Sequence, residues 1–181
     1  RSFADSDTHP RIVTLPPRPP FEEPLGRGRA RLLPWATVMV GSLVTVLPWS
    51  ATLPLLPPVG LLILLSWRLL APLSLRVWAP ALLGLFDDLL SGQPLGSAML
   101  LWTLAYFLVD AIDARSGVHD FQQSWSIAAL AIALVLLGGR LVATPLDAHV
   151  DSVLLIQIVT SVLLFPAAAR LVAWIDLRRA L

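Results

Sequence analysis

Cysteine and lysine are both absent from the 181 residues of this chain. Without cysteine the protein has no disulfides, no thiolate nucleophile and no cysteine-ligated metal. Charge is also scarce, because charged residues make up 14% of the chain, whereas a soluble domain carries roughly a quarter. All thirteen basic residues are Arg, the formal net charge is only +1, and we expect no nucleic acid as a partner.

Apolar residues are what the chain has in abundance. They account for 56% of it, and the mean hydropathy is +0.76. A soluble monomer of this composition would expose large apolar patches to water, which is an aggregation liability unless lipid covers them. The composition therefore predicts an integral membrane protein.

Six apolar stretches follow one another from residue 32 onward, and turn or polar residues separate them. Each is long enough, or nearly so, to cross a hydrocarbon core of about 30 Å at about 1.5 Å per helical residue. They lie at about 32–49, 56–75, 77–90, 95–113, 125–144 and 152–175. We predict an all-α integral membrane domain at 32–181 with about six transmembrane helices.

Residues 1–31 differ from the rest in composition. They contain six Pro, six Arg and four acidic residues, and they lack an apolar period. This composition predicts a disordered Pro/Arg-rich cytoplasmic tail. Its segment Pro16–Pro20 could alternatively dock into an aromatic groove.

The positions of Arg predict the orientation, because positively charged flanks stay on the cytoplasmic side of a membrane. With a cytoplasmic N-terminus and six spans, nine Arg fall on the inside and only Arg140 falls toward the outside. The nine are Arg27, Arg29, Arg31, Arg68, Arg76, Arg115, Arg170, Arg178 and Arg179. We therefore expect both termini to be cytoplasmic.

Asp87 and Asp88 close the third apolar stretch. Charge at membrane depth costs roughly 2.5 to 3.5 kcal/mol, so a carboxylate there usually has a partner, unless it reaches the interface and is hydrated. Gly84 and Asp88 share one helical face, and the turn from Ser91 to Gly96 follows at once. Asp88 could cap the next helix, whose first amides favour a carboxylate.

Six residues around Asp88 and the following turn form a candidate site, for which we expect a structural or partner-facing role rather than a catalytic one. They are Gly84, Asp88, Ser91, Gly92, Pro94 and Gly96. Gly92 permits a tight backbone, and Pro94 suits the first turn of the following helix.

Arg68 and Asp110 are candidates for an intramembrane pair between the second and fourth stretches. If both helices run to their predicted ends, both residues occupy the inner leaflet. Arg68 could simply extend to the headgroups. Alternatively its five donors could meet the Asp110 carboxylate, with Tyr106 one turn away on the same face.

Three motifs give the chain a resemblance to a known family. They are Leu47-Pro48-Trp49, the run 61–67 with Pro72 after it, and Gly84-x-x-x-Asp88-x-x-Ser91-Gly92-x-x-Leu95-Gly96. The chain resembles the rod shape-determining MreD proteins of bacteria, whose signature is similar to the last motif. Phe165-Pro166 and Arg170 also look similar, whereas the tail at 1–31 departs from the shorter start usual in that family.

The resemblance implies a non-enzymatic scaffold of the cell-elongation and peptidoglycan-synthesis complex in the bacterial inner membrane. It implies as partners a single-span MreC protein, the MreB filament, a RodA-type glycosyltransferase and a class B penicillin-binding protein. It also implies a six-helix fold similar to the substrate-binding subunits of energy-coupling-factor transporters. The resemblance implies no cofactor.

Two other functional classes remain open at this point. A small-molecule binding subunit of a transporter is the alternative, but it needs polar groups that converge inside the bundle, and few are available. An enzyme lacks a catalytic set: no Ser-His or Cys-His pairing, phosphate loop or H-E-x-x-H motif occurs. Asp147, His149 and Asp151 alternate like metal ligands, or they are solvated side chains of a short connection.

Overall fold

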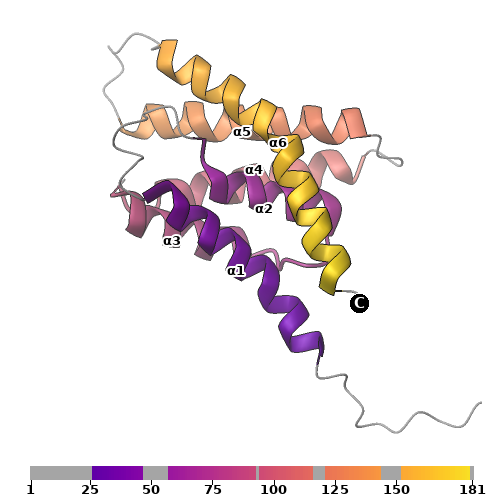
Figure 1. The fold of residues 1–181 in the computed structure, drawn as a ribbon. Helices are drawn as coiled ribbons and strands as arrows, with labels where there is room; N and C mark the ends of the chain where they lie inside the picture. The colour runs from indigo at the N-terminus through magenta and orange to yellow at the C-terminus, as the bar shows by residue number, and fades with distance from the viewer. Residues whose placement is uncertain (1–25, 47–56, 93, 116–120, 144–151, 180–181) are drawn as a thin grey trace, which may run out of the picture.

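A computed structural model describes residues 26–46, 57–92, 94–115, 121–143 and 152–179 (Figure 1). These ranges hold six α-helices and no strand: α1 (Gly26–Val46), α2 (Val59–Leu70), α3 (Ala79–Ser91), α4 (Ser97–Asp113), α5 (Phe121–Ala143) and α6 (Ser152–Arg179). The prediction of an all-α fold is confirmed for this part of the chain.

The short helix α2 lies at the centre of the bundle. Every residue from Gly60 to Arg68 is buried, and α2 packs against α1 on one side and α6 on another (Figure 1). A helix that is apolar on all faces is stable either inside a protein core or in contact with lipid. The packing of α1 and α6 against α2 places it inside the bundle, and the helices around it carry most of the exposed apolar surface.

The predicted length of the second stretch is wrong. α2 has 12 residues and ends at Leu70, whereas the sequence predicted a helix as far as residue 75. Its last turn closes with a hydrogen bond of 2.9 Å from the Ala71 N–H to the Trp67 carbonyl. Pro72 follows, and proline disfavours helical geometry at the residue before it. A helix of this length is about 18 Å long, well short of a full crossing.

Several other boundaries also differ from the sequence prediction, among them the start of α5 at Phe121 instead of about 125 and the end of α6 at Arg179 instead of about 175. α1 begins at Gly26, six residues before the predicted start at 32, because Arg and Ala continue the helix on the polar side of the apolar stretch. Residues 1–25 of the expected tail lie outside the described part. α4 begins at Ser97, so Pro94 lies in the turn before this helix. The prediction that Pro94 lies in the first turn of the helix is therefore wrong.

α5 and α6 are the two helices of the described part that are long and apolar enough to cross a membrane. Their candidate spans are Phe121–Val142 and Ser152–Arg178, with 22 and 27 residues. The start of α1 and the end of α6 lie at the same side of the bundle, at the right in Figure 1.

Candidate functional site

At Gly84 the backbones of α3 and α4 approach each other closely. A Cβ atom added at Gly84 would lie 2.7 Å from both the Ala98 carbonyl oxygen and the Met99 Cα. These are backbone atoms, so they cannot swing aside as the end of a side chain could. A hydrogen atom at position 84 is therefore what allows the first turn of α4 to pack on α3.

One turn further along α3, the carboxylate of Asp88 caps α4. Its Oδ2 atom accepts hydrogen bonds from the backbone N–H groups of Gly96 at 2.9 Å and Met99 at 3.2 Å. Its Oδ1 atom accepts from the Ala98 N–H at 2.8 Å and the Ser97 hydroxyl at 2.9 Å. Asp88 is 1% exposed. A buried carboxylate thus uses both oxygens to satisfy donors at the positive end of the α4 dipole.

The turn between the two helices depends on two glycines with left-handed backbone. Gly92 has φ of 67° after the end of α3, and Gly96 has φ of 94° before α4. Residues with a side chain rarely adopt such angles, whereas glycine adopts them freely. The Pro94 carbonyl accepts a hydrogen bond of 3.0 Å from the Ser97 N–H, and Ser91 is the last, exposed residue of α3. The turn returns the chain so that Asp88 faces the start of α4.

Arg68 lies in the last turn of α2 and contacts α4. Its Nη2 atom donates to Asp110 Oδ1, and its Nη1 atom is 3.3 Å from Asp113 Oδ2. The guanidinium carbon lies 5.3 Å from the centre of the Tyr106 ring. Arg68 is 5% exposed, whereas the side chain of Asp110 is 59% exposed. The cation is therefore buried between two carboxylates of α4 and an aromatic ring.

Asp113 was missed by the sequence reasoning, although a signal for it existed. Asp110 and Asp113 are three residues apart on α4 and therefore lie on one helical face. The predicted position of Arg68 well inside its helix is also wrong. α2 ends at Leu70, two residues after Arg68, so Arg68 lies in the last turn. A cation in the last turn is favourable for the α2 dipole.

The site residues predicted from the sequence lie in two separate groups in the structure. The turn residues gather at the α3–α4 junction, and Arg68 meets Asp110 between α2 and α4. Asp147, His149 and Asp151, the alternative metal ligands, lie outside the described residues. Within the described ranges no cluster of three or more His, Asp or Glu could hold a metal ion.

Comparison with known proteins gives one match to a family and none to a solved structure. No solved structure matches the chain, so its expected likeness to the substrate-binding subunits of energy-coupling-factor transporters stays a prediction. The family model of the rod shape-determining protein MreD matches residues 29–177. This range contains every helix except the first three residues of α1 and the last two of α6. The chain therefore belongs to the MreD family of rod shape-determining proteins.

Proposed function

We propose that this chain is a non-enzymatic scaffold of the cell-elongation complex in the bacterial inner membrane. Membership of the MreD family supports a part in rod-shape determination in a membrane. The scaffold joins the proteins of peptidoglycan synthesis through the surfaces of its helices. Its partners are an MreC-type single-span protein and, through the same complex, the MreB filament, a RodA-type glycosyltransferase and a class B penicillin-binding protein.

The main support for this proposal comes from the contacts of the buried charged side chains. Asp88 accepts hydrogen bonds from the first turn of α4, and Arg68 forms ion pairs with Asp110 and Asp113. A subunit that binds a polar substrate needs several polar groups that converge on a cavity. In the described ranges the two best-placed charged groups serve helix packing instead, which supports a scaffold.

Exposed apolar side chains supply the surfaces that a scaffold needs. On α4 they recur at helical spacing, with Leu100, Leu104 and Phe107 exposed by 57%, 48% and 47%. The Asp88 cap and the close approach at Gly84 hold this helix rigidly on α3. Apolar helix surfaces in a membrane associate by close packing, so a rigid surface loses little conformational entropy when a partner helix binds.

The proposal includes six membrane crossings with both termini in the cytoplasm. The connection at Arg115 would also be cytoplasmic, while residues 50–55, 91–94 and 145–151 would face outward. The excess of Arg on one side supports this orientation. The short helices α2 and α3 would cross within the bundle, with other helices and connections covering their ends.

Two experiments test the proposal. In a rod-shaped bacterium depleted of its own MreD, the chain should restore rod shape and should co-purify with the MreC-type protein of that cell. Round cells and absence of the MreC-type protein, despite normal accumulation in the membrane, would contradict the scaffold role. Reporters active on only one side of the membrane test the topology, and a periplasmic signal from a fusion after Leu181 would exclude six spans.

A further inference from the structure

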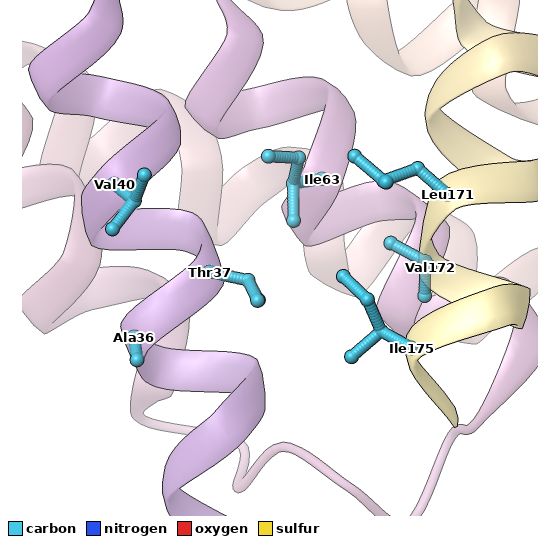
Figure 2. A pocket seen from close by; sticks show the side chains of 7 residues that line it. All are labelled: Ala36, Thr37, Val40, Ile63, Leu171, Val172 and Ile175. Carbon is cyan, nitrogen blue, oxygen red and sulfur yellow. The ribbon is translucent and has the colours of Figure 1, made fainter. Parts of the chain in front are cut away.

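An apolar groove lies between α1 and α6, with α2 beneath it. Figure 2 shows the side chains that line it, which come from all three helices. Ile63 and Val172 form a buried floor, exposed by 6% and 0%. Val40 and Leu171 form the rims and are 59% and 49% exposed. The groove has a volume of about 260 Å³ and is open at its rims.

Among the described residues, one polar side chain lines the groove, and it is already used within the protein. The Thr37 hydroxyl donates to the Pro34 carbonyl at 2.9 Å and accepts from Trp67 Nε1 at 2.9 Å. All other lining side chains are aliphatic. A polar ligand would lose its hydration here without gaining new hydrogen bonds, which is costly. The groove is therefore suited to hydrocarbon.

The shape and lining of the groove suit an acyl chain. The groove is open at its rims and lined by aliphatic side chains, so a flexible hydrocarbon chain can follow its shape without losing polar contacts. The charge beside the groove distinguishes a phospholipid from an apolar partner helix.

A cation lies beside the groove on α6. Leu171 and Ile175 line the groove, and Arg178 follows at a spacing of three, so the three residues share one face of the helix. Arg178 is about 4.5 Å further along the helix axis than Ile175. Its guanidinium carbon lies 3.7 Å from the centre of the Trp174 ring, and both side chains are exposed.

The pair of Trp174 and Arg178 has the chemistry of a membrane interface. Tryptophan favours the headgroup level of a bilayer, and a basic residue there attracts anionic lipid. The aromatic ring holds the guanidinium in place by a cation–π contact, and guanidinium N–H groups can donate hydrogen bonds to phosphate oxygens. Charge and apolar surface thus follow one another along α6 in the order of a phospholipid headgroup and its acyl chain.

We propose that the α1–α6 groove binds one acyl chain of an anionic phospholipid, whose headgroup phosphate meets Arg178. The lipid belongs to the leaflet that faces the C-terminal end of α6. The proposal rests on the membrane location of the family and does not depend on the scaffold role. The bound lipid would fill the gap between α1 and α6 and so hold these two helices on α2.

Native mass spectrometry of the full chain in mild detergent tests this binding. The probes are phosphatidylglycerol and phosphatidylcholine with identical oleoyl chains, added in equal amounts. The wild type should retain one phosphatidylglycerol in preference to phosphatidylcholine. Arg178→Gln should lower that preference about fivefold, the factor expected for one Arg near an anionic lipid. Arg115→Gln, which changes an exposed Arg outside the groove, should leave it unchanged.

Ala36→Phe tests the groove itself, because Ala36 is an exposed lining residue and its enlarged side chain would occupy the space of the lipid. This variant should lose the retained phospholipid, whereas Ala111→Phe on the exposed face of α4 should keep it. Unchanged retention of phospholipid in Ala36→Phe would overturn the proposal. If this variant also lost a co-purifying membrane protein, the groove would be assigned to a partner helix.

A labelled lipid makes the test independent of whether Ala36→Phe folds. Phosphatidylglycerol with a photoreactive group at the end of one acyl chain should crosslink to peptides of α1, α2 or α6 in the wild type. The same lipid with an added tenfold excess of unlabelled phosphatidylglycerol should crosslink less. Crosslinks restricted to α4 and α5, or crosslinks that unlabelled lipid does not reduce, would overturn the proposal.

Discussion

Substitution of Asp88 should weaken the junction of α3 and α4, and the loss of stability should be smaller for Asp88→Asn than for Asp88→Leu. In the structure each carboxylate oxygen accepts two hydrogen bonds, and the side chain is almost fully buried. Asp88→Asn keeps one of these oxygens and replaces the other by an NH2 group, which cannot accept. The orientation of the new amide therefore decides the cost.

The better orientation of the amide keeps the oxygen at the Oδ2 position. The Gly96 and Met99 amides then retain their acceptor, and the Ser97 hydroxyl can rotate to accept from the new NH2 group. Only the Ala98 N–H is left without a partner. An unsatisfied buried donor costs about 1 to 3 kcal/mol, which is the loss of folding free energy expected for Asp88→Asn.

Asp88→Leu removes both acceptors and leaves the start of α4 without a cap. The expected loss is about 3 to 5 kcal/mol, at the upper end for a single substitution, because several donors lose their partners together. Thermal unfolding in detergent and the yield of monodisperse protein should fall in the order wild type, Asp88→Asn, Asp88→Leu. Rod-shape complementation should follow the same order.

The neighbouring Asp87 provides a matched control. It is less buried than Asp88 and lies near Ser42 of α1, and it makes no hydrogen bond to the start of α4 in the described residues. Asp87→Asn should therefore leave the α3–α4 junction intact. Wild-type thermal stability and cell shape in Asp88→Leu would refute the capping argument, as would equal losses from Asp87→Asn and Asp88→Asn.

Two further predictions concern the contacts of α4 and α2. Gly84→Ala should lower the free energy of unfolding by about 1 to 3 kcal/mol, since α3 and α4 must separate to relieve a backbone contact of 2.7 Å. Gly139→Ala is the control, because the nearest atom to its added Cβ is 3.8 Å away. Equal melting temperatures for the two variants would argue against close packing at Gly84. Asp110→Leu should lower the folded yield more than Arg68→Leu, because Arg68 is buried and Asp110 can be hydrated alone. The double variant should recover much of the yield, and additive losses would show that the pair does not contribute.

Much of the candidate site could be predicted because its residues are close in the sequence. Gly84 and Asp88 are one helical turn apart, and Gly92 and Gly96 bracket a turn that returns the chain on itself. A short turn forces the end of one helix to lie beside the start of the next, so a carboxylate just before the turn has free amides within reach. The misplacement of Pro94 shows the limit of this reasoning, because local preference does not give the exact start of a helix.

The lengths of α1 and α2 could not be read from hydropathy. Apolar residues continue past Leu70, and only the break at Ala71 and Pro72 separates helix from connection. At the other end of the domain, Arg residues before Leu32 extend α1 beyond its apolar stretch. Hydropathy reports which residues avoid water, whereas helix ends depend on backbone hydrogen bonds that the flanking residues can or cannot make.

The sequence by itself determined the class of this protein: an all-α chain with too little charge for water and with six apolar segments of helical length. Those properties are local, because a segment in lipid must satisfy its own backbone hydrogen bonds whatever surrounds it. The tertiary structure decided what is not local. Arg68 could have reached the headgroups or a carboxylate, and only the packing of α4 against α2 supplied Asp110 and Asp113. Likewise the α1–α6 groove exists because helices distant in sequence meet the buried α2, and no segment alone carries that information.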